Sequence, residues 1–299
     1  MQRIQLANDL SFSRVIHGEM RSLEWGMSVD DYQGFIEQLL ARGITTIDHA
    51  DIYGGFEGEA FLGKVFAQAP SLRDQLEIVT KCGIQYPNPQ YPTTYTTHYN
   101  YEYEYIIQQA ERSLTTLQIE TLDVLLLHRP SPLMDAQAIA KAFVDLKAAG
   151  KVRHFGVSNF YQDHFNLIQA AIDQPLVTNQ IEVSAVCHEH IDNGNLDFLQ
   201  CKQVAPMIWS PLAGGRIFQP QSAADIRTKQ AIEEIATDLG VSVDAVLYAW
   251  LYKMPNNLMP IVGSGKLERI DVAIDALELT LTVQQWFTIL QAQMGHSIK

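Results

Sequence analysis

The chain has 299 residues, of which 47% are hydrophobic and 18% charged, a composition typical of a globular protein with a large core. Acidic residues outnumber basic ones by 34 to 21, and the formal net charge is −13. A surface this acidic repels nucleic-acid phosphates and anionic lipids, so we expect neither nucleic acid nor a membrane as a partner. The first 18 residues lack the apolar core of a signal peptide, and no apolar run is long enough for a membrane span.

A regular alternation of apolar segments and amphipathic helical patterns runs along the chain. Residues 2–12 are predicted to form a short hairpin, and residues 284–294 a last helix. Between them, eight apolar, β-branched segments have the length and continuous hydrophobicity of strands that are buried on both faces of a parallel sheet. These segments are residues 14–20, 44–50, 76–82, 122–128, 152–159, 176–182, 205–211 and 258–265.

The helical patterns between these strands have clear ends. The first begins after Ser28, which forms a predicted capping box with Asp31, and it ends before Gly43. Later patterns end at Gly150 and Gly240 in the same way. With no linker-like break in composition, the alternation predicts an α/β fold in one domain over residues 1–299. That domain is a single (β/α)8 TIM barrel with a short N-terminal hairpin and an extra C-terminal helix.

Polar side chains stand where several of the predicted strands end. In this architecture the carboxyl ends of the strands form the active-site face, so these side chains are expected to converge. Any one of them could be a satisfied structural residue, and an isolated Asp–Lys pair at a barrel rim is more often a structural ion pair. An acid, a lysine and a histidine on consecutive strands favour catalysis. The strand-end residues are Asp48, Lys81, His128, Ser158, Asn159, Gln180 and Ser210.

The sequence around these positions resembles the aldo-keto reductase family, in its bacterial oxidoreductase branch. Seven segments resemble the family's signatures, in order and in register with the strands. They are DHADIYGG (48–55), VTKCG (79–83), LLLHRPSP (125–132), GKVRHFGVSN (150–159), TNQIEVS (178–184), WSPLAGG (209–215) and IVGSGK (261–266). The resemblance implies that the chain reduces aldehyde or ketone carbonyls with NADP(H).

The resemblance implies a catalytic tetrad of Asp48, Tyr53, Lys81 and His128. Hydride transfer to a carbonyl creates negative charge on its oxygen, which a general acid must protonate. Tyr53 is the expected acid, and an ammonium from Lys81 is expected to lower its pKa. Asp48 would hold the lysine charged, and His128 would hydrogen-bond the substrate oxygen. His49 replaces a small family residue and either tunes the surroundings of Lys81 or only packs.

The resemblance also implies a set of cofactor-binding residues. Ser158, Asn159 and Gln180 correspond to the groups that bind the nicotinamide carboxamide, and Trp209 to an aromatic residue that stacks on the nicotinamide. The loop after it would pass over the pyrophosphate. The implied residues of this loop are Ser210, Pro211, Leu212, Gly214 and Arg216.

A second implied segment, Gly263, Ser264, Lys266 and Arg269, lies at a predicted helix N-terminus, which favours an anion. Two cations there favour the 2′-phosphate of NADP(H) over the 2′-hydroxyl of NAD(H), although a solvated Lys–Arg pair is the plainer interpretation. The Rossmann G-x-G-x-x-G motif is absent, and PIVGSGKL lacks the first Gly and the Ser/Thr of a Walker A motif.

Two other functions compete with the reductase. A cofactor-binding redox-sensing subunit, like the potassium-channel β-subunits, would bind NADPH and turn over slowly. A phosphate-dependent isomerase or lyase on an unrelated barrel would use Lys266 and Arg269 for substrate phosphate, but it leaves Tyr53, Asn159 and Gln180 without roles.

Three cysteines, Cys82, Cys187 and Cys201, form no C-x-x-C motif and favour a reduced, cytoplasmic protein. No metal site is predicted, because Cys187 and its neighbouring histidines lack a clear set of four ligands. Loops 21–27, 86–101 and 187–195 are expected to form the walls of a pocket for a small carbonyl substrate. The sequence leaves the substrate and the oligomeric state open.

Overall fold

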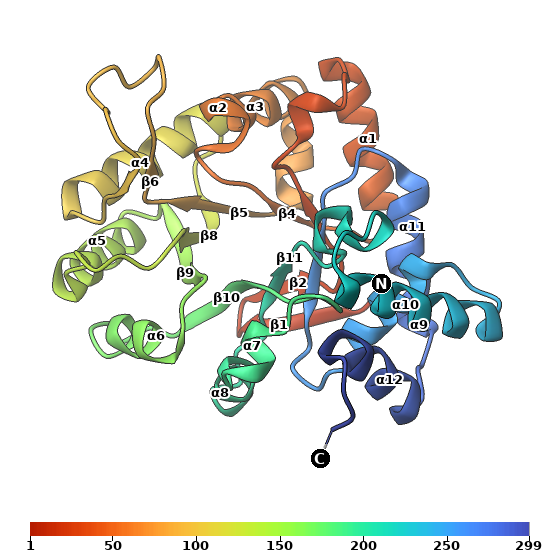
Figure 1. Cartoon of the computed structure of the whole chain (residues 1–299). Helices are drawn as coiled ribbons and strands as arrows, with labels where there is room; N and C mark the ends of the chain where they lie inside the picture. The colour runs from red at the N-terminus through yellow and green to blue at the C-terminus, as the bar shows by residue number, and fades with distance from the viewer. Residues whose placement is uncertain (299) are drawn as a thin grey trace. The chain divides into compact units, whose positions relative to one another are not determined.

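The computed structural model describes residues 1–298 and contains a closed barrel of eight parallel strands surrounded by helices (Figure 1). Around the barrel the strands follow the order β10, β11, β12, β3, β4, β5, β8 and β9. This confirms the predicted (β/α)8 fold. The barrel strands are β3 (Ile16–Gly18), β4 (Thr46–Asp48), β5 (Glu77–Cys82), β8 (Leu122–Leu127), β9 (Val152–Ser158), β10 (Leu176–Glu182), β11 (Met207–Trp209) and β12 (Met259–Val262).

All eight predicted strand segments contain an observed strand, usually shorter by one to four residues. Every residue of β8 is buried. Burial on both faces explains the largely apolar sequence of this strand. Neighbouring strands are in parallel register, with Lys81 of β5 opposite Leu126 of β8. The chain divides into two compact units, Met1–Gln180 and Ile181–Lys299. The single domain predicted for residues 1–299 stays a prediction.

The first unit alternates its strands with helices that cover them. Ser28 caps the first helix, and the predicted capping box with Asp31 is present. Gly43 follows that helix with φ 77°, a left-handed conformation that glycine adopts without a steric penalty. The helices of this unit are α1 (Val29–Ala41), α2 (Tyr53–Phe56), α3 (Gly58–Gln68), α4 (Tyr103–Leu117), α5 (Ala136–Ala148) and α6 (Gln162–Gln169), with 3-10 turns at Ser22–Glu24 and Pro70–Gln75.

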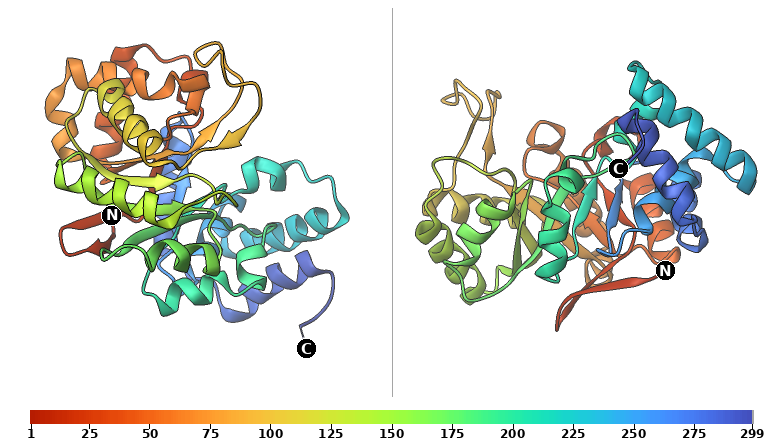
Figure 2. Two further views of the ribbon diagram at one scale, coloured as in Figure 1. Left: turned by 90° about the vertical axis from the view of Figure 1, so that its left-hand side faces the viewer. Right: turned by 60° about the horizontal axis from the view of Figure 1, so that its bottom comes forward.

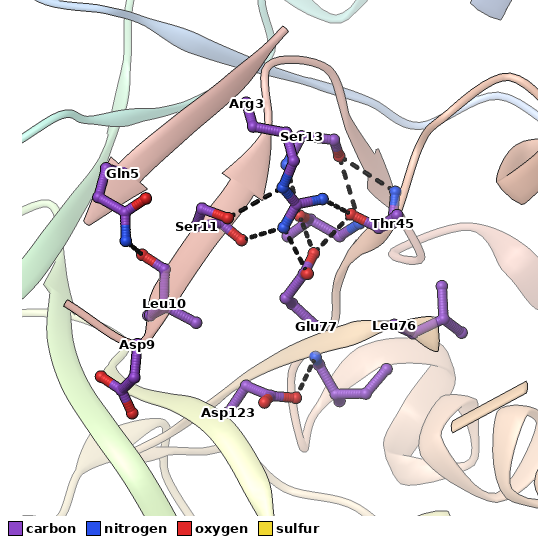
Figure 3. A network of polar contacts seen from close by, with 12 residues as sticks. Arg3, Gln5, Asp9, Leu10, Ser11, Ser13, Thr45, Leu76, Glu77 and Asp123 are labelled. Carbon is purple, nitrogen blue, oxygen red and sulfur yellow. Dashed lines mark hydrogen bonds and ion pairs between the residues drawn. The ribbon is translucent and has the colours of Figure 1, made fainter. Parts of the chain in front are cut away.

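The predicted N-terminal hairpin consists of β1 (Arg3–Ala7) and β2 (Leu10–Ser13), paired antiparallel. Arg3 ties it to the amino-terminal ends of the barrel strands (Figure 3). Its guanidinium donates to the Thr45 hydroxyl at 2.6 Å and forms an ion pair with Glu77 at 2.6 Å. Glu77 also accepts hydrogen bonds from Thr45 and Thr46. The hairpin therefore lies at the end of these strands opposite to their carboxyl ends.

The second unit contains β11, β12 and six helices, two of which precede β11. The predicted C-terminal helix is α12, and its packing depends on two tryptophans. Trp250 and Trp286 stack with their ring planes 3° apart, and each indole N–H donates to the other residue's carbonyl. The helices are α7 (Glu189–Asp192), α8 (Asn195–Cys201), α9 (Ala223–Leu239), α10 (Val243–Tyr252), α11 (Leu267–Asp275) and α12 (Val283–Met294), with 3-10 turns at Ala213–Phe218 and Ala276–Glu278.

Candidate active site

Lys81 lies near the carboxyl end of β5 with a fully buried side chain. Its ammonium nitrogen is 2.9 Å from each carboxylate oxygen of Asp48 on the neighbouring strand β4. The same nitrogen donates to the His49 carbonyl at 2.6 Å and lies 3.0 Å from the Tyr53 hydroxyl oxygen. The structure thus brings three of the four predicted tetrad residues into direct contact around one buried cation.

The electrostatics of this cluster differ in one respect from the sequence-based expectation. Burial alone would lower the pKa of Lys81, but the charge of Asp48 and the contact with Tyr53 outweigh it and raise that pKa, so the amine stays protonated. Lys81 does lower the pKa of Tyr53, as expected, but burial of the phenol has the larger, opposite effect. The net pKa of Tyr53 is therefore raised, not lowered. At neutral pH the phenol carries its proton.

Tyr53 begins a tight turn whose backbone is unusual. Gly54 and Gly55 have φ values of 59° and 68°, and Phe56, which has a β-carbon, has φ 73°. A left-handed conformation costs a residue other than glycine about 1–2 kcal/mol. Such a conformation persists only where surrounding contacts hold it. The turn that carries the Tyr53 hydroxyl to Lys81 is therefore maintained by its neighbours.

His128 follows β8 directly, and its ring lies beside that of Tyr53, with centroids 6.2 Å apart. Burial, and then the positive charge of Lys81, hold its pKa well below the usual value, so the ring is neutral at neutral pH. Its buried Nδ1 has no hydrogen-bond partner among residues 1–298. A neutral imidazole can still donate one hydrogen bond to a carbonyl oxygen.

The three residues predicted to bind a carboxamide lie next to this cluster. The Asn159 side-chain amide donates to the Ser158 hydroxyl at 2.8 Å and to the His128 carbonyl at 3.3 Å. The Ser158 hydroxyl donates to the Gln180 carbonyl at 3.0 Å. The Gln180 amide donates to Asp48 at 2.7 Å. Sequence reasoning missed this last contact, since Gln180 carried a predicted role toward a cofactor alone.

A second buried acid also escaped the sequence analysis. Glu19 comes just after β3, and its N–H donates to the Asp48 carbonyl at 3.0 Å. Its side chain is fully buried and lies 3.3 Å from His17 Nε2. Burial raises the pKa of Glu19 to about 7 and lowers that of His17 to about 3. The sequence shows that Glu19 lies near a strand end, which is a position typical of site residues. It does not show that the Glu19 side chain is buried.

The remaining predicted residues belong to the second unit. After Trp209 the chain takes left-handed conformations at Ser210 (φ 48°), Gly214 (φ 63°) and Gly215 (φ 91°). A β-carbon on either glycine would meet no atom within 4 Å, so a large group can approach this backbone closely. Arg216 already donates to the Val186 carbonyl at 2.8 Å. Pro211 and Leu212 lie in the same segment, directly before the 3-10 turn Ala213–Phe218.

The predicted anion site lies where α11 begins. Lys266 is the N-cap of this helix, its side chain is exposed, and its N–H donates to the Ser264 hydroxyl. No side chain caps the helix, so its first N–H groups can meet an anion. Arg269 is exposed in the first turn, and Gly263 precedes the segment. The structure therefore places Ser264, Lys266 and Arg269 at the start of the same helix.

Other predictions concern single residues. The His49 side chain is fully buried, and burial lowers its pKa to about 4. Its carbonyl rather than its ring contacts Lys81, so it holds the lysine through the backbone. Within residues 1–298, no group of three His, Cys, Asp or Glu side chains could hold a metal. No helix in the same range has both the length and the hydropathy that crossing a membrane requires.

The chain is similar to proteins of one family over nearly its whole length. The family model described as the aldo/keto reductase family matches residues 14–293. An oxidoreductase of Bacillus subtilis (strain 168), YcsN, is 48% identical, and the match covers all of both chains. A 6-dehydroglucose reductase of Agrobacterium fabrum is 43% identical, again over all of both chains. Among solved structures, a glycerol dehydrogenase from Gluconobacter oxydans superposes with a TM-score of 0.83 at 21% identity, covering 99% of this chain and 97% of that one.

Proposed function

Because this chain belongs to the aldo/keto reductase family, we propose that it reduces aldehyde or ketone carbonyls to alcohols with NADPH, using Tyr53 as the general acid. One observation carries the mechanism. The ammonium of Lys81 lies between both Asp48 oxygens and the Tyr53 hydroxyl. A buried lysine that a carboxylate holds against a phenol is suited to polarise that phenol.

With its pKa raised by burial, the phenol of Tyr53 is protonated at neutral pH and has a proton to donate. In the ground state the phenol keeps its proton. When negative charge develops on the substrate oxygen, the proton passes to that oxygen, and the adjacent ammonium of Lys81 stabilises the phenolate that remains. Asp48 keeps the ammonium charged and oriented throughout.

His128 is proposed to orient the substrate. Its lowered pKa keeps the ring neutral, so it contributes one hydrogen-bond donor and no added charge beside Lys81. The ring edge lies next to the Tyr53 ring. One carbonyl oxygen could accept hydrogen bonds from both, which fixes the carbonyl for hydride attack.

The donor groups of the chain fit a nicotinamide cofactor, which supplies the hydride when bound. Ser158, Asn159 and Gln180 offer amide and hydroxyl groups for a carboxamide, and Trp209 offers a ring for stacking. The left-handed segment that contains Ser210, Pro211, Leu212, Gly214 and Arg216 suits a pyrophosphate. Gly263, Ser264, Lys266 and Arg269 suit a 2′-phosphate.

A turnover assay tests this proposal. Purified protein is mixed with NADPH and a panel of aldehydes and ketones, and the absorbance of the reduced nicotinamide is followed. Consumption of NADPH that depends on the carbonyl is expected. Tight NADPH binding without turnover would instead favour a redox-sensing subunit, and no binding would favour an unrelated barrel enzyme.

The panel should include 6-dehydroglucose. A relative named for the reduction of this sugar aldehyde is 43% identical to the chain over its full length. We propose an oxidised sugar as one candidate substrate, with reduction taking place in the cytoplasm. A kcat/KM for 6-dehydroglucose no higher than for simple aldehydes would contradict the sugar assignment and leave the reductase assignment intact.

A further inference from the structure

The segment between β6 (Ile84–Gln85) and β7 (His98–Tyr99) divides into two parts with different surroundings. Its tip extends away from the helices of the first unit (Figures 1 and 2), and Tyr95 is 91% exposed there. Its base, residues 86–91, packs instead against the turn that carries Tyr53. The expectation that residues 86–101 form a wall of the substrate pocket stays a prediction.

The base of this loop contacts the turn mainly through Phe56. The Phe56 ring stacks on Tyr86, with centroids 5.0 Å apart, and meets Tyr91 edge-on at 4.7 Å. The Tyr86 hydroxyl donates to the Ile52 carbonyl at 3.5 Å, the long limit for such a bond. These rings surround the residue whose left-handed backbone needs outside support.

Arg112, on α4, contacts both the turn at Phe56 and the base of the loop at Gln90. Its guanidinium donates to the Phe56 carbonyl at 3.3 Å and to the Gln90 side chain at 3.4 Å. The same group lies 5.4 Å from the Phe56 ring centroid and 5.5 Å from that of Tyr91. One side chain thus contacts both the turn and the loop, through hydrogen bonds and through ring faces.

Two buried acids lie near Arg112. Asp51 and Glu59, 1% and 2% exposed, flank the turn in sequence. Burial raises the pKa of both carboxyls, and the positive charge of Arg112 offsets part of that effect. The proposed reaction uses neither acid. Arg112 is therefore the cation next to this acidic pair, and its contacts are with Phe56, Gln90 and the ring of Tyr91.

The other end of the loop contacts the strand end that carries His128. The Tyr101 hydroxyl donates to the Arg129 carbonyl at 2.6 Å and accepts from the Arg129 N–H at 3.0 Å. The Tyr101 ring covers Gly83, where a β-carbon would come within 2.2 Å of it. Gly83 directly follows β5, the strand of Lys81, so this ring packs between two strand ends of the site.

We propose that Arg112 and Tyr101 are positioning residues for Tyr53 and His128. Arg112 contacts the first part of the loop 83–101 and Tyr101 lies at its end, and both contacts hold the two site residues in their reactive geometry. Arg112 acts on Tyr53 through Phe56, and Tyr101 acts on His128 through the Arg129 peptide. Neither contacts the reacting atoms. The effect on rate rests on the reductase function proposed above, but the effect on backbone order does not.

Two conservative variants test the proposal. Tyr101→Phe removes both hydrogen bonds to Arg129 and keeps the ring over Gly83. Arg112→Met removes the donors and keeps most of the side-chain volume. We expect each to lower kcat by between about 10- and 100-fold, the range for slight misplacement of reacting groups, with little change in KM. Arg112→Lys, which keeps the charge but not the fork of donors, should recover part of the loss.

Matched controls separate positioning from general loss of stability. Tyr103 lies two residues after Tyr101, at the start of helix α4. Tyr103→Phe removes a hydroxyl that donates to Asp145 at 2.8 Å. Arg153→Met removes an arginine that pairs with Asp9 and Asp123, beside the N-terminal hairpin. Both controls should leave kcat unchanged.

Amide hydrogen exchange supplies the readout that is independent of activity. Peptides covering residues 50–60 should exchange faster in Arg112→Met, and peptides covering residues 126–132 faster in Tyr101→Phe, than in the two controls. Unchanged exchange would overturn the proposal, and it would do so even if the wild-type protein reduced no carbonyl. A raised KM with unchanged kcat would also overturn it, because the loop would then line the substrate pocket.

Discussion

The amine of Lys81 lies 3.0 Å from the hydroxyl oxygen of Tyr53, close enough for a charged hydrogen bond in a buried setting. Hydrogen bonds of this kind are about twice as strong as neutral ones. The hydrogen bond joins a fully buried cation to a tyrosine that keeps some solvent access, so the charge acts on a residue that a small molecule can reach.

Tyr53→Phe should remove the proton donor and leave the cofactor residues untouched. We expect kcat to fall about 10²- to 10⁴-fold, the usual contribution of general acid catalysis. Steady-state kinetics and a fluorescence titration with NADPH would measure the two effects separately. A near-normal kcat would mean that another group protonates the substrate.

Lys81→Met should destabilise the protein as well as inactivate it. The variant leaves Asp48 buried without its cation, and breaking a buried ion pair in this way costs about 3–5 kcal/mol. Urea unfolding would measure the loss. Adding Asp48→Asn should restore part of the stability but none of the activity, because the neutral amide needs no counter-ion. Equal stability of the single and double variants would contradict this pairing.

Arg269→Ala should weaken NADPH binding much more than NADH binding, because only NADPH carries the 2′-phosphate that an exposed cation at the start of α11 could bind. Dissociation constants from fluorescence quenching would measure both. Arg227→Ala, at another exposed arginine of the same unit, serves as the control and should change neither. An equal loss for both cofactors would remove the 2′-phosphate assignment.

Glu19→Gln should make the protein more stable at alkaline pH. The folded-state pKa of Glu19 is about 7, against an ordinary value of 4.5, so the folded protein binds this proton more tightly than the unfolded chain does. Stability is therefore lost as the pH rises from 4.5 towards 7. At about 1.4 kcal/mol per pKa unit the full effect is on the order of 3 kcal/mol.

The glutamine removes this loss, so its advantage over the wild type should grow from pH 5 to pH 8 and then level off. Urea unfolding across that range would measure it. Glu24→Gln, at an exposed glutamate close by in sequence, should show no such trend. If the difference in unfolding free energy between Glu19→Gln and the wild type did not change with pH, Glu19 would not have a raised pKa in the folded protein.

The sequence by itself determined the strands, the helix ends and the order of the site residues. These features depend on local properties: continuous apolar runs that suit a strand buried on both faces, a Ser28–Asp31 capping box, a glycine where a helix must stop. Since the carboxyl ends of parallel barrel strands share one face, polar residues at several strand ends were enough to anticipate that Asp48, Lys81 and His128 would lie at the same end of the barrel.

Only the tertiary structure decided how those residues behave. The Gln180 amide reaches Asp48 across 132 positions of sequence, and Phe56 adopts a left-handed conformation because rings from a distant loop enclose it. The net pKa of Tyr53 rises because burial outweighs the nearby ammonium, and Glu19 is a buried acid although an acidic side chain is usually exposed. Burial and long-range contacts depend on every neighbouring segment at once, so no local pattern contains them.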